Sequence, residues 1–226
     1  MDTDTSTCDV VIPYKTSYPD TELFYSLRSF RNVRHRNIYL VGDKPSWYKG
    51  HHIEVEHYKW LNAYTVHNQE NKIRAACELP ELSENFILSN DDFFIMKPVI
   101  LKQYHRGFLK DHIAQRNKRD QYQRSLVQTL ELLNRMGIEN PLSFELHVPM
   151  IMNKDKRLQL SYDMETWLKR GYIPLFRSLY GNLHIDNAEY MSDVKNVGDF
   201  ENYTYLSTSE ATFKGSIGNY IKQVIQ

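Results

Sequence analysis

Residues 86–96 read FILSNDDFFIM, two runs of large apolar side chains separated by Asn90, Asp91 and Asp92. The apolar runs predict buried β-structure, and the polar triplet marks the point where the first strand ends. Two adjacent ionised carboxylates repel each other and lose hydration when buried, so they need a positive partner. Carboxylate and amide oxygens suit Mg²⁺ or Mn²⁺. The stretch therefore predicts a cation site at the end of a strand.

The alternation of side chains along a strand refines this prediction. Asn90 and Asp92 would point to one side of the strand and Asp91 to the other. We therefore expect Asn90 and Asp92 to share the metal, and Asp91 to orient a helper residue or a sugar hydroxyl. A structural alternative is that one aspartate caps a turn while the other pairs with Arg74 or Lys97.

The rest of the first hundred residues alternates between strand and helix patterns. Strand patterns occur at 10–12, 37–41, 53–55 and 86–88, and helix patterns at 21–30 and 71–79. This order is typical of an α/β layer with a mainly parallel sheet. Ligands gather at the carboxyl ends of such strands, so the polar residues at 14–15, 43–44 and 90–92 should meet at one edge.

The helix patterns are clearest next to the first strand and after residue 120. Asp20 or Thr21 can cap the first helix. Its expected core face consists of Leu23, Phe24, Leu27 and Phe30. A helix is expected over 121–136, before Gly137, and another over 163–170. A closing strand at 204–208 and a terminal helix around 217–221 complete the prediction.

Composition excludes several classes of protein. The 226 residues carry no formal net charge, so no global field favours nucleic acid or membranes. Two cysteines cannot build a disulfide framework. The start, MDTDTSTCD, is acidic and polar, unlike a signal peptide, and no apolar stretch is long enough to span a bilayer. We expect a soluble, cytoplasmic protein.

Segment 105–124 is an exception to the balanced charge. It contains six lysines or arginines against two aspartates, a local charge of +4. Such a run is either a solvated helix face or a surface for ligands that carry phosphate.

A resemblance to known transferases rests on the acidic block. A buried strand that ends in an acidic triplet resembles the metal-binding DxD element of GT-A fold glycosyltransferases. LPELSENFILSNDDFFIMKPV, residues 79–99, is similar to the NDDFF-type block of the stealth family, which transfers hexose 1-phosphate in capsule and lysosomal-tag synthesis. The resemblance covers about 9–100 well and 144–184 weakly. The first strand of this chain ends in Pro13-Tyr14-Lys15, whereas the stealth family carries Trp-Val-Asp-Gly at this place. The ending found in this chain is more similar to that of ordinary GT-A enzymes.

The resemblance implies one GT-A-like (Rossmann-like) α/β domain over 1–226, with a helical insertion after the acidic motif. About 9–100 would bind the nucleotide sugar and about 101–226 the acceptor. Binding of the donor is expected from Pro13, Tyr14, Lys15, Asp43, Asn71, Lys72 and Arg74.

Other candidate residues lie in the second half of the chain. Glu145 or His147 could act as the general base for an acceptor hydroxyl. Arg177 and Tyr180 could bind phosphate and sugar or the acceptor. His184 is a candidate third metal ligand beside Asn90 and Asp92, of the kind that GT-A folds often use.

The function expected from these features is a Mn²⁺- or Mg²⁺-dependent glycosyltransferase. It would move a sugar from a nucleotide sugar, a UDP-sugar by preference, to a hydroxyl of a glycan. A hydroxylated nucleic-acid base held by segment 105–124 is a variant acceptor. One alternative is a stealth-type hexose-1-phosphate transferase, and another is a noncatalytic nucleotide- or carbohydrate-binding module.

Overall fold

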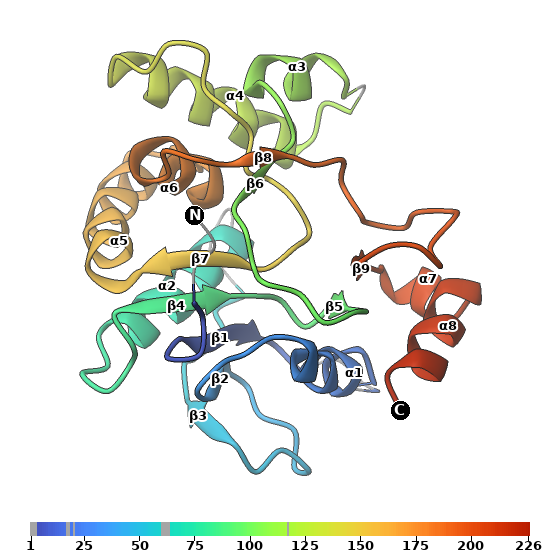
Figure 1. The fold of residues 1–226 in the computed structure, drawn as a ribbon. Helices are drawn as coiled ribbons and strands as arrows, with labels where there is room; N and C mark the ends of the chain where they lie inside the picture. Colours follow the sequence, from blue (N-terminus) through green and yellow to red (C-terminus); the bar gives the residue numbers. More distant parts are fainter. Residues whose placement is uncertain (1–3, 17–18, 20, 60–63, 117) are drawn as a thin grey trace.

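The computed structural model describes residues 4–16, 19, 21–59, 64–116 and 118–226. Its centre is a five-stranded sheet with the order β3-β2-β1-β4-β7 (Figure 1). The first four of these strands are parallel, and β7 is antiparallel to β4. These strands are β1 (Asp9–Tyr14), β2 (Ile38–Gly42), β3 (His51–Ile53), β4 (Asn85–Leu88) and β7 (Met150–Asn153). The mainly parallel α/β class expected from the sequence is confirmed.

Alternation along the strands builds one apolar core on each face of the sheet. Val11 and Val41 face a core formed with helices on one side, whereas Val10 and Leu40 face a second core on the other. All four side chains are fully buried. Burial of one such side chain contributes roughly 2 kcal/mol. The β-branched runs therefore hold the sheet between two layers.

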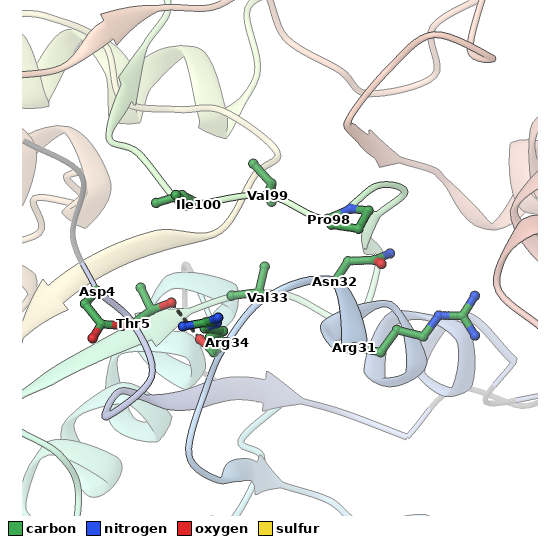
Figure 2. Close-up of a pocket in the computed structure, with 9 residues that line it drawn as sticks. All are labelled: Asp4, Thr5, Arg31, Asn32, Val33, Arg34, Pro98, Val99 and Ile100. Carbon is green, nitrogen blue, oxygen red and sulfur yellow. Dashed lines mark hydrogen bonds between the residues drawn. The ribbon is translucent and has the colours of Figure 1, made fainter.

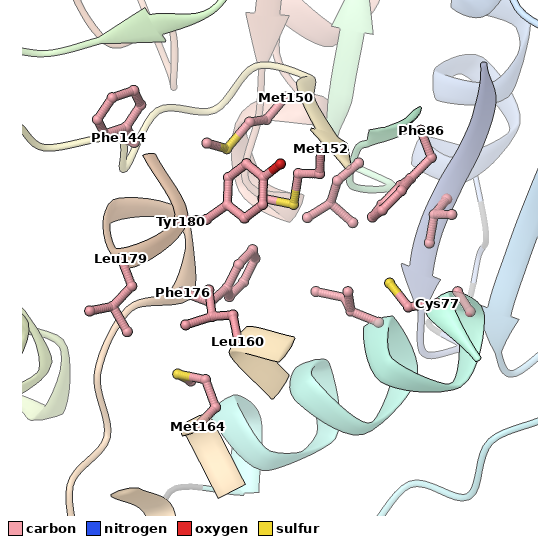
Figure 3. Packing of buried hydrophobic residues seen from close by; sticks show 14 of the residues in the cluster. Cys77, Phe86, Phe144, Met150, Met152, Leu160, Met164, Phe176, Leu179 and Tyr180 are labelled. Carbon is pink, nitrogen blue, oxygen red and sulfur yellow. The ribbon is translucent and has the colours of Figure 1, made fainter. Parts of the chain in front are cut away.

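The two cores are covered by different helices. The helices are α1 (Thr21–Ser29), η1 (Phe30–Asn32), α2 (Tyr64–Cys77), α3 (Leu109–Ala114), α4 (Gln121–Arg135), α5 (Lys154–Lys169), α6 (Phe176–His184), α7 (Glu210–Phe213) and α8 (Ser216–Val224). Helices α2, α4, α5 and α6 contribute to the first core, and α1 and η1 contribute to the second. Figure 3 shows the first core, where Met150 and Tyr180 pack beside Phe86 and Cys77. Within the described residues, no helix is both long and apolar enough to cross a membrane.

Most expected elements are present, with three differences. The third strand lies at 51–53 instead of 53–55, and α2 and α5 both begin before the expected residues. Phe24 was expected in the core but is 39% exposed, because it packs edge-on against Trp47 at the surface. Thr21 begins α1, whereas Asp20, the other candidate cap, lies outside the described residues.

The pairing of β7 with β4 decides which residues meet at the carboxyl edge. Leu88 pairs with Met150 in antiparallel register. Residues just before Met150 therefore lie next to residues just after Leu88. This register brings His147 to the same edge as Asn90, although the two residues are far apart in the sequence.

Two small sheets extend the fold beside this edge. β5 (Phe93–Ile95) pairs with β9 (Tyr205–Ser207), and this pair packs under α7 and α8. β6 (Tyr104–His105) pairs with β8 (Glu189–Tyr190). The C-terminal part of the chain therefore packs beside the strand that follows the acidic triplet.

A buried ion pair fixes α2 to α5. The two Nη atoms of Arg157 lie 2.6 and 3.2 Å from the carboxylate oxygens of Glu70, and the arginine side chain is fully buried. The guanidinium also lies 5.0 Å from the ring centroid of Phe176 on α6. Breaking one partner of such a pair usually costs 3–5 kcal/mol, roughly. The pair therefore holds in place the helix that carries Lys72.

Gly42 ends β2 with a φ of +114°, a conformation that favours glycine. A side-chain carbon at this position would overlap the carbonyl oxygen of Tyr14 and the end of the Lys72 side chain. We predict that Gly42→Ala lowers the free energy of unfolding by about 2 kcal/mol, because strain and overlap add. Unfolding in urea measures the change.

Gly198→Ala is the matched control for this prediction. Apart from its two chain neighbours, no described residue has an atom within 4 Å of a side-chain carbon built at Gly198. Its effect should stay within about 0.5 kcal/mol. Equal stability of the two variants would contradict the close approach at Gly42.

Candidate functional site

The two aspartates lie in a turn beyond the end of β4. The strand stops at Leu88, and residues 91 and 92 form a turn before β5 begins. Strand alternation therefore does not apply to them, and the expected pairing of Asn90 with Asp92 on one side is wrong. Asn90 and Asp91 line one cavity together, whereas Asp92 turns towards the C-terminal part of the chain.

Asp92 has its own cation. Its Oδ2 lies 3.1 Å from the Nζ of Lys195, and Ser207 is close by. Neither Arg74 nor Lys97, the partners considered from the sequence, makes this contact: Lys97 donates to the carbonyl of Asn202. Asp92 is thus already neutralised by an ion pair within the chain.

The aspartate cavity, as we call it, has a volume of about 380 Å³ at the carboxyl ends of β1 and β4. Lys15 and Lys72 line it together with Asp91. Its remaining lining residues are Pro13, His57, Thr65, Asn68, Gln69 and Asn90. Two ammonium groups opposite a carboxylate form a site suited to a phosphate-bearing ligand with or without a bound cation.

Lys72 is held at this cavity by the backbone of the first strand. Its ammonium group donates to the carbonyl oxygen of Tyr14, and only 4% of the residue is exposed. Burial lowers the pKa of Lys72, while the nearby carboxylates of Asp43 and Asp91 oppose that shift. The side chain of Tyr14, a candidate for donor binding, packs in the core, and its carbonyl oxygen is the group that contacts Lys72.

Asp43 supports the same corner from the end of β2. Its Oδ2 accepts a hydrogen bond of 2.8 Å from the backbone N–H of Thr16. This contact closes the loop that carries Lys15. Asp43 is therefore a neighbour of the aspartate cavity and a counter-charge for Lys72.

The carboxyl group of Asp91 has a strongly raised pKa. Burial, and then the charge of neighbouring Asp92, raise the pKa of Asp91 to about 7, and Lys72 offsets part of this effect. With a pKa near neutrality, the carboxyl group can bind a cation when it is ionised and can donate a hydrogen bond when it is protonated.

A second cavity, the histidine cavity, has a volume of about 450 Å³ and adjoins the first. His147 Nδ1 lies 2.9 Å from both carboxylate oxygens of Asp193. Burial opposes ionisation of Asp193, but the hydrogen bonds and charge of His147, helped by Arg106, hold its pKa below the usual range. The arrangement fixes the imidazole ring and leaves Nε2 for a proton of a bound ligand.

Glu145 and Arg177 line the wall of the histidine cavity. Glu145 accepts hydrogen bonds from the backbone and hydroxyl groups of Ser178, at 3.0 and 2.8 Å. Burial raises the pKa of Glu145, and Arg177 opposes that shift. Arg177 donates to the carbonyl oxygens of Phe144 and Val148. Glu145 and Arg177 are thus both engaged in hydrogen bonds within the protein. Of the two candidates for the general base, Glu145 and His147, the histidine is therefore the better placed.

The two cavities are parts of one site. Thr65, Gln69 and Asn90 line both of them. A ligand in the aspartate cavity and a second ligand in the histidine cavity would therefore meet at Asn90. This geometry suits a reaction between two bound substrates.

Two residues expected to bind the donor lie elsewhere. Arg74 pairs with Glu165 at 3.2 Å and with Glu78 at 3.9 Å, because two further positions along α2 turn it away from Lys72. Asn71 is partly exposed on the same helix and, like Arg74, is not among the residues that line the two cavities.

His184, the expected third metal ligand, is also remote from the acidic turn. It ends α6, about 10 Å along the helix from Arg177. Its ring packs at 4.9 Å against Tyr180, whose hydroxyl accepts from the backbone N–H of Asn153. Asn153 pairs with the first residue of β4, so His184 and Tyr180 lie towards the opposite edge of the sheet.

A metal ion at the site would depend on the ligand for part of its coordination. The described ranges contain no group of three His, Cys, Asp or Glu side chains placed to hold a metal ion. Mg²⁺ is commonly bound by one or two carboxylates together with substrate phosphates. Asn90 and Asp91 fit that mode, because both offer oxygen atoms to the aspartate cavity.

A cavity larger than these two lies elsewhere in the described part of the chain. It measures about 680 Å³ and lies between Thr5, Arg31–Arg34 and Pro98–Ile100 (Figure 2). Residues 31–34 precede β2, so this cavity lies near the amino ends of the parallel strands. No candidate residue from the sequence lines it. Its size therefore does not make it the favoured site.

The mainly parallel α/β fold thus places an acidic turn and two adjoining cavities at the carboxyl edge of its sheet, where ligands gather in folds of this class. No protein-family model matches the chain. The chain is similar to capsular polysaccharide phosphotransferases. Fcs1 of Haemophilus influenzae is 29% identical over 175 residues, which are 70% of this chain and 43% of that protein.

Two relatives from Neisseria meningitidis carry the same description. LcbA is 33% identical over 93 residues, 34% of this chain and 24% of the relative. The phosphotransferase of serogroup B is 27% identical over 121 residues, 47% of this chain and 32% of the relative. The chain thus matches less than half the length of each relative. These similarities bear out the likeness to capsule-synthesis transferases that the NDDFF block indicated.

Several residues of the site were not singled out from the sequence. Asp193, Lys195 and Glu22 carried no signal, because each reaches the site through tertiary contacts. Thr208 donates to Glu22 at 2.6 Å beside the acidic turn. Arg106 and Arg116 belonged to the basic segment, but only the fold places both in the wall of the histidine cavity.

The raised pKa of Asp91 predicts that the free energy of unfolding falls as the pH rises. The folded-state pKa of about 7 exceeds the ordinary value of 3.8, so the native state binds more protons between these values. Stability from this group is complete below pH 4 and is lost as the pH rises to 7. In the absence of divalent cations, Asp91→Asn should be more stable than the wild type at pH 8, by up to about 4 kcal/mol.

Urea unfolding between pH 4.5 and 8 measures this difference. The gain in Asp91→Asn should shrink as the pH falls. Asp186→Asn, an exposed aspartate, is the control and should follow the wild type within about 0.5 kcal/mol. Parallel curves for Asp91→Asn and the wild type would refute the burial of this carboxyl group.

Proposed function

We propose that this chain is a transferase that moves hexose 1-phosphate from a nucleotide sugar to a hydroxyl group, with a UDP-sugar as the expected donor. The observation that carries the proposal is the joining of two cavities at Asn90, one with lysines and a carboxylate, the other with a His–Asp pair. Similarity to three capsular polysaccharide phosphotransferases supports transfer of a sugar phosphate.

The donor diphosphate would bind in the aspartate cavity. Lys15 and Lys72 supply fixed positive charge where negative charge grows on the leaving phosphate. Asn90 and Asp91 would hold Mg²⁺ or Mn²⁺, which when bound supplies Lewis-acid neutralisation of the same charge. Asp92 would stay paired with Lys195 and keep the turn in place without contacting the metal ion.

The acceptor hydroxyl would bind in the histidine cavity. His147, held by Asp193, would take the hydroxyl proton on Nε2. The acceptor oxygen then forms a bond to the β-phosphorus. The bond from that phosphorus to the bridging oxygen breaks, and the nucleotide leaves as its monophosphate.

We further propose that the two cavities divide the single domain into two functional halves, as the GT-A resemblance implies. Lys15, Lys72 and Asp91 all belong to residues 9–100. His147, Arg177 and Asp193 belong to residues 101–226. The first half would thus bind the donor and the second the acceptor.

Glycosyl transfer is the second candidate function. The first strand ends in Pro13-Tyr14-Lys15, without the acidic residue that the stealth-type ending carries, and this favours a break at the sugar carbon. The nucleotide would then leave as its diphosphate. A noncatalytic binding module would differ from both, since ligand binding would be indifferent to chelators and to changes at Asp91.

Donor binding gives the test of this proposal. The melting temperature is measured with UDP-, GDP-, CMP- and dTDP-sugars, each with Mn²⁺, Mg²⁺ or EDTA. We predict that one nucleotide sugar with metal raises it by roughly 5–10 °C at a hundredfold excess over Kd. Lys72→Met and Asp91→Asn should lose most of this rise.

Arg74→Met is the matched control, because it removes one cation from the same helix outside the cavities. It should retain the full rise in melting temperature. No rise with any donor in the folded wild-type protein, or an undiminished rise in Lys72→Met, would overturn the proposed function.

A further inference from the structure

One end of the histidine cavity carries basic side chains that the transfer reaction itself does not require. Arg106, His112, Arg116 and Tyr122 line this part of the cavity. Arg106 comes directly after β6, His112 lies in α3, Arg116 follows α3 and Tyr122 lies in the first turn of α4. The basic segment noted in the sequence thus directs two of its arginines into the site.

Neither arginine is fully neutralised by its neighbours. Arg106 approaches Asp193 only to 3.7 Å, and Asp193 is already bound to His147. Arg116 pairs at 2.9 Å with Asp120, which is 45% exposed. The buried Nε of Arg116 has no hydrogen-bond partner among the described residues. A buried guanidinium donor without a partner is costly and predicts a ligand atom that accepts from it.

The surrounding side chains orient these donors. The Arg116 guanidinium lies 4.6 Å from the ring centroid of Tyr122. His112 Nδ1 is 2.9 Å from the hydroxyl of Ser143. Burial, and then the charges of Arg106 and Arg116, lower the pKa of His112 to about 4, so both arginines act on the same point. Stacking on Tyr122 restricts Arg116 before any ligand binds.

We propose that this end of the cavity binds a phosphate group of the acceptor, so that the acceptor is a sugar or polyol phosphate whose free hydroxyl faces His147. The inference rests on the proposed function and adds the chemical class of the acceptor. Guanidinium groups bind phosphate through paired hydrogen bonds. A cavity of about 450 Å³ favours one small phosphate ester unit over a base-paired duplex.

Glycerol 3-phosphate is a suitable probe, since it joins a phosphate to free hydroxyl groups, and glycerol is its neutral control. Binding is measured by calorimetry at constant ionic strength. We predict that glycerol 3-phosphate binds and glycerol does not, and that Arg116→Gln and Arg106→Gln each weaken binding roughly tenfold or more. Two variants keep the test valid if one of them fails to fold.

Arg119→Gln is the matched control. It removes the same charge from an exposed position of the same segment that does not line the cavity. Its affinity should stay within about twofold of the wild type. Equal weakening in Arg119→Gln and Arg116→Gln would overturn the proposal, because a diffuse positive surface would then explain binding. Tighter binding of a single-stranded oligonucleotide that depends on Arg119 would overturn it in favour of a nucleic-acid surface.

Competition with the donor separates this inference from the proposed function. Glycerol 3-phosphate should bind equally well when the donor identified by melting is saturating. Displacement by that donor would place the donor phosphates at Arg116 and refute the acceptor assignment. If no donor binds but glycerol 3-phosphate still depends on Arg116, the proposed transferase reaction fails while the phosphate site stands.

Discussion

Two adjacent carboxylates can share one partly buried turn here because each lies near a different lysine. Lys72 approaches Asp91 from α2, and Lys195 contacts Asp92 at 3.1 Å from the C-terminal part of the chain. Without these cations, mutual repulsion and lost hydration would raise the cost of the turn by several kcal/mol, roughly. Because each carboxylate has its own lysine, Asp91 lines a cavity while Asp92 holds the C-terminal part of the chain to the turn.

The pairing of distant strands delivers the remaining groups to the same edge. β7 runs against β4 and brings His147 beside Asn90. β9 runs against β5, and residue 195 bridges to Ser207 next to Asp92. Residues 193 to 195 therefore touch both the histidine and the acidic turn. One short segment thus links His147 to the acidic turn.

The sequence predicted the elements whose signals are local. Short continuous apolar runs located the parallel strands, and the acidic triplet located the carboxyl edge where Asp91 and Lys72 meet. It could not predict the turn at 91–92, because strand alternation stops where pairing stops. Arg74 and His184 were misplaced for a related reason: the direction of a helical side chain depends on how the helix packs, which spacing alone does not reveal.

In the proposed reaction a sugar phosphate, and not a sugar, is transferred from the donor. Water can stand in for the acceptor when the wild-type protein is incubated with its donor in H₂¹⁸O. The released nucleotide and sugar are then identified by phosphorus NMR and mass spectrometry. The account predicts nucleoside monophosphate together with hexose 1-phosphate that carries the label on phosphorus. Nucleoside diphosphate with free labelled hexose would contradict it and make the chain a glycosyltransferase.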